Sequence, residues 1–202
     1  MKINSNNYKN FTYFILVLIG ISTLVVYAVF YFLDTNNIKI PFYLSIPSIP
    51  TLYGLLFFIF DRKLWKWKIF RKLGIISADD LNGEWKGIAK SSYDKMEEEI
   101  NVTLKIKQTA TNIVICGDFN NSKSISLNAN FEKNDVDDGI ALFYFYRNQP
   151  DYDAKETMAI HEGATKLIYN KQDNSLTGFY FSGRNRNNHG TIKVFRNKKQ
   201  QL

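Results

Sequence analysis

Few residues in this sequence could carry redox, metal or nucleophilic chemistry. It has one cysteine, Cys116, which excludes an intrachain disulfide, and its two histidines form no Cys/His cluster with zinc spacing. Walker-type phosphate loops, G-x-S-x-G elbows and H-E-x-x-H motifs do not occur. His161 and Glu162 are neighbours on a predicted strand, where adjacent side chains point to opposite faces, so they cannot form a simple dyad. We therefore predict a protein that is not an enzyme, without catalytic residues, metal ligands or a cofactor.

An excess of basic charge is absent from most of the chain. Residues 1–72 hold nine Lys or Arg against two Asp or Glu, while residues 73–202 hold seventeen of each, so the net charge of +7 belongs to the first part. Binding to duplex nucleic acid would need a basic face on the second part, and we expect no such partner. The charge instead follows membrane topology and predicts contact with anionic lipid.

Long apolar runs occur only in the first sixty residues. Residues 11–33 are 23 positions without a charge, and about 20 helical residues cross a bilayer, so we predict transmembrane helix 1 here. A cleaved signal peptide is the competing interpretation, but its apolar region usually has about 7–15 residues. A turn over 34–39 precedes a second apolar run over 40–60, the predicted transmembrane helix 2. Its prolines allow either a helix that begins near Pro41 and bends, or a shorter one that begins at Pro50.

A basic, tryptophan-rich segment over 61–77 follows, which we interpret as a juxtamembrane linker. It carries six Lys or Arg and two Trp. Positive residues beside spans stay in the cytoplasm, and tryptophans prefer the headgroup level. The tail over 1–10 and the C-terminal domain over 78–202 are therefore predicted to lie in the cytoplasm, and the 34–39 turn in the periplasm.

Beyond residue 78 the apolar pattern changes to period two. Apolar and polar residues alternate over 100–107 and 124–131, which is typical of strands. Short turn-rich breaks predict an antiparallel up-and-down meander that closes into an eight-stranded β-barrel, with an open sandwich as the alternative. The fold class is thus a membrane-anchored all-β protein with an N-terminal two-helix transmembrane hairpin, and its barrel has room for one small ligand. The candidate strands are 83–93, 99–109, 112–118, 122–133, 140–147, 157–169, 176–183 and 190–196.

Side chains that could bind an anionic nucleotide fall on these strands and at their ends. Hydroxyls donate to phosphates, tyrosines stack on bases for roughly 1–3 kcal/mol each, and guanidinium groups bind phosphates in bidentate fashion. Each has a plainer explanation: a serine stripe facing solvent, arginines solvated at strand ends, and a hydrogen-bonded structural histidine. The candidate ligand-binding residues are Ser124, Ser126, Tyr144, Tyr146, Arg147, His161, Tyr180, Arg184 and Arg186.

Two predicted strands are apolar on both faces. Along 140–146 tyrosines share one face and phenylalanines the other, and Tyr180 likewise separates two phenylalanines. A barrel buries one face of each strand, so the second face needs a partner: another protomer, the N-terminal segment or the membrane surface. This pattern predicts self-association, with packing under a covering segment as the alternative.

The order of these features resembles the two-transmembrane, β-strand-rich effectors of bacterial CBASS anti-phage systems. The similarity runs from the first apolar helix to the last strand. Its motifs are Gly83-Glu84-Trp85-Lys86-Gly87, Leu104-Lys105-Ile106-Lys107-Gln108, Ser122-Lys123-Ser124-Ile125-Ser126, Leu142-Phe143-Tyr144-Phe145-Tyr146, His161-Glu162-Gly163, Gly178-Phe179-Tyr180-Phe181-Ser182-Gly183-Arg184 and Gly190-Thr191-Ile192.

The resemblance implies a multi-pass protein of the bacterial inner membrane with its barrel in the cytoplasm. It further implies that a cyclic dinucleotide, or another cyclic oligonucleotide, is the activating ligand, that bound protomers form a homo-oligomer, and that the helices then act on membrane lipid to cause abortive infection. Two other functions stay open. One is a membrane-tethered, lipocalin-like carrier of an apolar ligand, since lipocalins also begin with G-x-W; the other is a non-enzymatic adaptor whose aromatic outer face docks a partner.

Overall fold

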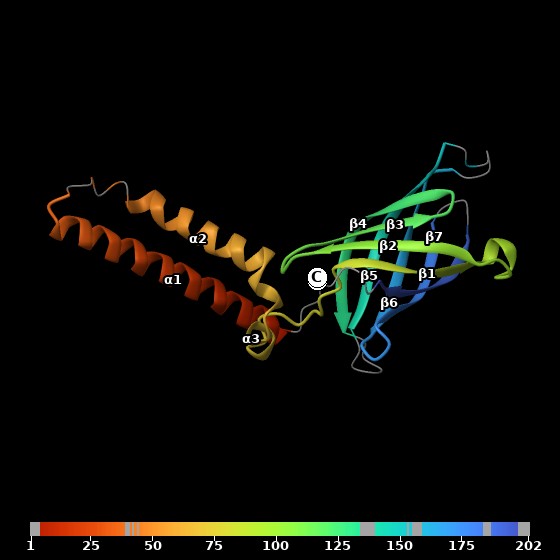
Figure 1. The fold of residues 1–202 in the computed structure, drawn as a ribbon, viewed down its shortest axis with the longest axis horizontal. Coiled ribbons are helices and arrows are strands. Elements are labelled where there is room, and N and C mark those ends of the chain that lie inside the picture. Colours follow the sequence, from red (N-terminus) through yellow and green to blue (C-terminus); the bar gives the residue numbers. More distant parts are fainter. Residues whose placement is uncertain are drawn as a thin grey trace. The chain divides into compact units, whose positions relative to one another are not determined.

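The computed structural model describes residues 5–38, 41, 43, 45–133, 140–152, 154, 159–183 and 187–197. The chain is divided into two compact units (Figure 1). Among the described residues, a helical unit contains those from Ser5 to Ser77 together with 109–111, and a barrel unit contains Ala78–Gln108 and those from Asn112 onward.

The helical unit begins with one long apolar helix, α1 (Ser5–Thr35). Apolar side chains cover it on all sides and most are exposed, whereas Ser22 and Val26 are buried. A helix that is apolar all round is typical of a membrane span. Within the described residues, α1 is the one helix whose length and composition suffice to cross a bilayer.

The second helix, α2 (Ser45–Arg62), packs against α1 and holds Pro50 within its length. The expected start near Pro41 falls on a stretch of which residues 39, 40, 42 and 44 lie outside the described part of the chain. Proline removes one backbone donor from the helix. A second crossing over 40–60 is not shown by the structure and stays a prediction.

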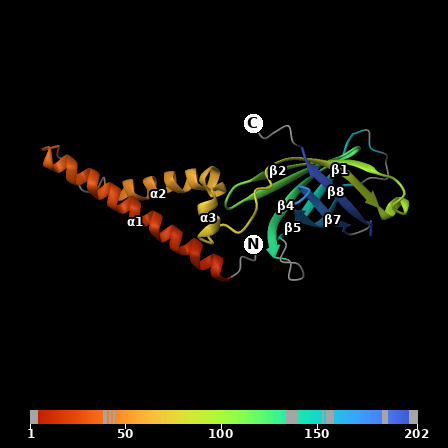
Figure 2. The same ribbon diagram turned by 60° about the horizontal axis from the view of Figure 1, so that its bottom comes forward.

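A short segment, Asp61–Ile76, closes the helical unit, and we call it the elbow. It contains the single-turn helix η2 (Leu64–Lys66) and α3 (Lys68–Lys72). Trp65 is fully buried with Phe60 in an aromatic cluster, and the Phe60 ring lies 4.4 Å from that of Phe14 on α1. The Asn10 side chain donates to the Leu73 carbonyl at 3.1 Å. The elbow is therefore held beside the start of α1 (Figure 2).

Asp61 fixes the other end of the elbow. Its carboxylate accepts from the Thr111 backbone N–H at 3.0 Å and from the Thr111 hydroxyl at 2.8 Å, while its carbonyl accepts from the Ala110 N–H at 3.1 Å. These bonds explain why residues 109–111, a turn between two strands, belong to the helical unit.

Eight antiparallel strands form the barrel unit in chain order, and β1 pairs with β8 to close it (Figure 2). The closed barrel predicted from the sequence is confirmed, and the open sandwich is excluded. A one-turn helix, η3 (Ser92–Asp94), follows β1. The strands are β1 (Gly83–Ser91), β2 (Ile100–Gln108), β3 (Ile113–Phe119), β4 (Ser122–Lys133), β5 (Ile140–Pro150), β6 (His161–Asn170), β7 (Ser175–Ser182) and β8 (His189–Arg196).

Side chains fill the end of the barrel at which β1 begins. Trp85 is fully buried, its Nε1 donates to the Leu81 carbonyl at 2.9 Å, and the Arg196 guanidinium lies 4.6 Å from its ring. Leu104, Leu142, Leu167, Leu176 and Val194 are fully buried around it. A close-packed interior of this kind leaves no space for a ligand at this end of the barrel.

A β-bulge in β4 reverses which residues face inward. Ser126 lies opposite Tyr146 and Asn128 opposite Phe145, so Leu127 is the extra residue. On one side of the bulge Ser122, Ser124 and Ser126 face the interior, while on the other side Ala129 and Phe131 pack on the core. Ile125 and Leu127 are consequently exposed. The serine stripe, for which exposure to solvent was the plainer explanation, therefore faces the barrel interior.

The bulge also ends the ladder between β3 and β4. Their pairing stops at Cys116 opposite Ile125, and the next N–H, that of Ile115, donates to the Ser126 hydroxyl at 2.9 Å. Cys116 is a free thiol on the exposed face of β3.

Candidate ligand-binding site

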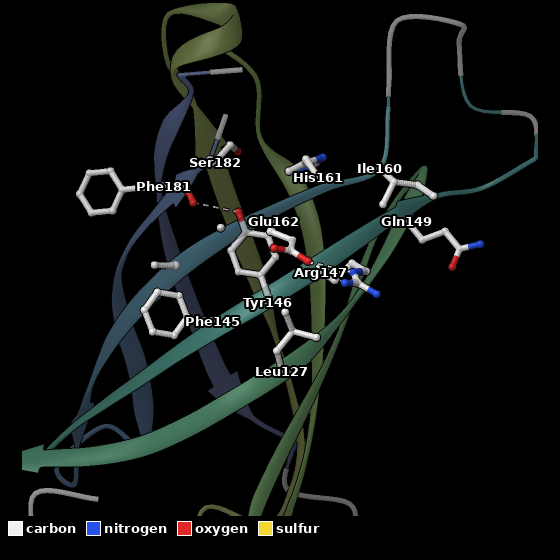
Figure 3. Close-up of a pocket in the computed structure, with 13 residues that line it drawn as sticks. Leu127, Phe145, Tyr146, Arg147, Gln149, Ile160, His161, Glu162, Phe181 and Ser182 are labelled. Carbon is white, nitrogen blue, oxygen red and sulfur yellow. Dashed lines mark hydrogen bonds and ion pairs between the residues drawn. The ribbon is translucent and has the colours of Figure 1, made fainter. Parts of the chain in front are cut away.

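One open pocket lies at the end of the barrel where β5 and β7 finish and β6 begins (Figure 3). Its volume is about 1010 Å³, which is at the upper end of the roughly 300–1,000 Å³ typical of small-molecule sites. It is lined by Leu127, Phe145, Tyr146, Arg147, Gln149, Ile160, His161, Glu162, Gly163, Ala164, Phe181, Ser182 and Gly183.

Two exposed phenylalanines form the walls of this pocket. Phe145 on β5 and Phe181 on β7 both lie in register with Ala164 on β6, so the three residues form one row across the outer face. Neighbouring strands are about 4.8 Å apart, which separates the backbones of the two phenylalanines by roughly 10 Å. With only a methyl group between them, the row leaves room for a flat apolar or aromatic group.

An ion pair occupies the next row. Arg147 lies opposite Glu162, and its Nη2 and Nε donate to the same carboxylate oxygen at 2.7 and 3.1 Å. Both side chains are more than half exposed. The positive charge in the pocket is therefore already paired, and an incoming phosphate would compete with Glu162 for it.

Tyr146 and His161 lie beside this row on the inward faces of their strands. The Tyr146 hydroxyl donates to the Phe181 carbonyl at 3.3 Å, and its ring packs edge-on against that of His161 at 6.3 Å. His161 Nδ1 is 3.1 Å from the Ala159 carbonyl. A side chain at Gly163 would clash with the Tyr146 hydroxyl and the Phe181 carbonyl. Glycine is thus required for Tyr146 to reach β7.

The structure brings three of the nine predicted site residues into the pocket. Tyr146, Arg147 and His161 line it. Arg184 and Arg186 lie outside the described residues, directly after the lining residue Gly183. The other four, Ser124, Ser126, Tyr144 and Tyr180, face the barrel interior and do not line the pocket.

The barrel interior behind the pocket is polar. Ser122, Asn148 and Thr165 are buried there. Tyr144 is also buried, and desolvation raises its pKa, helped by the neighbouring Tyr146 and opposed by a hydrogen bond with Thr165. The bulge in β4 adds to this polar interior, because without it Ser122, Ser124 and Ser126 would face outward.

Sequence reasoning missed Glu162, Ala164 and the aromatic walls as parts of one site. The signal was present in part, since phenylalanines were expected on the second face of β5 and β7, where they are exposed. Over the part of the chain that the structure describes, no three His, Cys, Asp or Glu side chains gather as a metal site requires.

A closed antiparallel barrel with an aromatic-walled pocket at one rim is an architecture that can hold a small ligand. The family model described as "Cap15, cyclic dinucleotide receptor domain" matches residues 76–196, and the chain belongs to this family. The membership confirms the resemblance to CBASS antiviral effectors and identifies the barrel as a cyclic dinucleotide receptor domain.

Two curated relatives, both called CD-NTase-associated protein 15, are similar to the chain. The protein from Yersinia aleksiciae is 30% identical over 154 residues, which are 75% of this chain and 71% of the relative. The protein from Staphylococcus schleiferi is 30% identical over 128 residues, which are 61% of this chain and 64% of the relative. The match therefore spans less than two thirds of the Staphylococcus protein.

Proposed function

We propose that the protein is an anti-phage effector that a cyclic dinucleotide activates. The ligand binds the barrel, bound protomers associate, and the N-terminal helices disrupt the inner membrane, which causes abortive infection. The observation that carries the proposal is the rim pocket within the barrel that the receptor family model matches.

The pocket suits a molecule with flat bases and phosphates. A base fits over Ala164 between Phe145 and Phe181, where stacking on aromatic rings is worth roughly 1–3 kcal/mol per base. A phosphate next to it reaches Arg147, and Tyr146 and His161 border the same space. The part of the ligand that enters the barrel is contacted by Ser124, Ser126, Tyr144 and Tyr180. Two arginines that follow Gly183 in the sequence, Arg184 and Arg186, add positive charge.

Association is proposed to use the outer face that holds Ile125, Leu127, Phe145, Phe179 and Phe181. Each of these side chains is between 45% and 53% exposed, and exposed large apolar side chains gathered on one face are typical of an interaction surface. A ligand shifts the assembly equilibrium only if it binds the assembled form more tightly. The position of the pocket within this face gives the ligand a route to do so.

We further propose that both α1 and α2 cross the inner membrane and that the barrel lies in the cytoplasm. Support comes from the length and exposed apolar surface of α1, and from the packing of α2 along it. At 18 residues α2 is short for a bilayer, which a thinned membrane or a partner helix would accommodate.

Thermal unfolding of the full chain in detergent, with a panel of cyclic di- and trinucleotides, tests the receptor function. A ligand at 100 times its dissociation constant stabilises the native state by about 2.7 kcal/mol, which raises Tm by several degrees. We expect one nucleotide to act among silent isomers, and Arg147→Ala and Arg184→Ala to weaken its effect. A flat panel with a cooperative unfolding transition contradicts the proposal.

A carrier of an apolar ligand is the second candidate, which the apolar walls Leu127, Phe145, Ile160 and Phe181 favour. It predicts a lipid that co-purifies with the protein and competes with fluorescent fatty acids. A constitutive complex that no small molecule alters would instead indicate an adaptor.

A further inference from the structure

The elbow carries a high density of positive charge. Six Lys or Arg lie between Arg62 and Lys72, whereas the only carboxylate of residues 61–77 is that of Asp61. That carboxylate accepts two hydrogen bonds from Thr111. The six cationic side chains are all exposed: Arg62, Lys63, Lys66, Lys68, Arg71 and Lys72.

Large apolar side chains are exposed between these cations. Trp67, Ile69 and Leu73 are each 56–59% exposed, although a separate set of apolar residues in the same segment is buried in the aromatic cluster. The elbow thus has two apolar faces, one of which packs on α1 and α2. The other has no neighbour among the described residues that would bury it.

The position of the elbow fits the boundary of a bilayer. The Asn10–Leu73 hydrogen bond holds it beside the first turns of α1, where the apolar surface of that helix begins. Tryptophan and exposed cations at such a level are typical of the membrane–water interface. The elbow therefore lies at the level where the apolar surface of α1 begins.

We propose that the exposed face of the elbow binds anionic phospholipid. Trp67, Ile69 and Leu73 enter the headgroup region, and the flanking cations, with Lys68, Arg71 and Lys72 foremost, contact lipid phosphates. Each Lys or Arg near an anionic surface adds attraction that salt weakens. The proposal rests on the membrane location in the proposed function and is independent of the nucleotide pocket.

Trp67 provides the test, because Trp65 and Trp85 are fully buried and Trp67 is the exposed tryptophan of the three. The full chain is placed in phosphatidylcholine nanodiscs that contain the same minor fraction of brominated phosphatidylglycerol or of brominated phosphatidylcholine. Subtracting the signal of Trp67→Phe isolates the quenching of Trp67. We expect about twofold stronger quenching by the brominated phosphatidylglycerol at low salt.

Charge variants separate lipid recognition from simple immersion. The triple variant Lys68→Gln, Arg71→Gln, Lys72→Gln should equalise quenching by the two lipids, as should high salt in the wild type. The matched control Lys105→Gln, Lys107→Gln, Lys193→Gln neutralises exposed barrel cations and should keep the preference. Equal quenching in the wild type, or a preference that survives the triple variant, overturns the proposal. The triple variant should keep the Tm shift that the nucleotide induces. If the wild type shows no such shift, the proposed nucleotide-receptor function is contradicted and the lipid proposal is not affected.

Discussion

At the scale of single residues, the pairing of Arg147 with Glu162 sets how strongly the pocket attracts anions. Glu162→Gln frees the guanidinium, and because exposed ion pairs are worth up to about 1 kcal/mol, we expect two- to fivefold tighter nucleotide binding by calorimetry. Arg147→Gln should weaken binding about tenfold or more, since hydrogen bonds to charged groups contribute about 1.5–3 kcal/mol. Glu132→Gln, an exposed change on β4 outside the pocket, is the control. Weaker binding by Glu162→Gln would mean that the carboxylate itself contacts the ligand.

Buried Tyr144 predicts a loss of stability in alkali. Its pKa is raised by burial, whereas in the unfolded chain it ionises near pH 10. The stabilising contribution is complete below about pH 10 and falls by roughly 1.4 kcal/mol for each pH unit above it, because only the unfolded state then loses the proton. Tyr144→Phe should lack this part of the slope when urea unfolding is compared at pH 8 and 11. Parallel slopes for the two proteins would show that Tyr144 ionises in the folded barrel.

At the scale of elements, the bulge in β4 depends on a side chain in place of a backbone partner. Ser126→Ala removes the acceptor of the Ile115 N–H, and leaving a buried donor unsatisfied costs about 1–3 kcal/mol. Ser124→Ala, on the same face of the same strand, is the matched control with an expected change below about 0.5 kcal/mol. Urea unfolding measures both, and equal losses would contradict the role given to Ser126.

Close packing of β6 against β7 leads to a second expectation for the elements. Gly163→Ala would place a methyl group against the Tyr146 hydroxyl and the Phe181 carbonyl, and such overpacking typically costs about 1–3 kcal/mol. A lowered Tm together with weaker nucleotide binding is expected. An unchanged Tm would show that Tyr146 moves aside without cost.

The strands also show which features of the fold the sequence pattern could predict and which it could not. Alternation predicted β2 and β4 to within a residue of each end, because side chains on a strand change face at every step. The same alternation concealed the bulge, since Ser and Asn continue to alternate with apolar residues through Leu127 while the strand changes face. The Arg147–Glu162 pair was hidden for another reason: the residues are 15 positions apart and meet only through the register of β5 and β6.

At the scale of the whole molecule, assembly can be separated from ligand binding. Ile125 and Phe179 belong to the outer face proposed for association, which we call the aromatic face, but they do not line the pocket. The double variant Ile125→Lys, Phe179→Lys should keep the nucleotide-induced Tm shift and stay monomeric when the ligand is added, as measured by analytical ultracentrifugation in detergent. The control is Tyr93→Lys, at an exposed aromatic side chain of η3 that belongs neither to this set of residues nor to the pocket lining. Ligand-driven association of the double variant would place the interface elsewhere.

The single thiol of the chain gives such an assembly a covalent signature. Cys116 is exposed and lies opposite Ile125 in the ladder between β3 and β4, at the border of the aromatic face. If two protomers meet along this border, mild oxidation links them through one disulfide. One sulfur atom forms one such bond, so a disulfide can join only two chains. A non-reducing gel would therefore show a band of twice the chain mass and no heavier bands, however large the assembly.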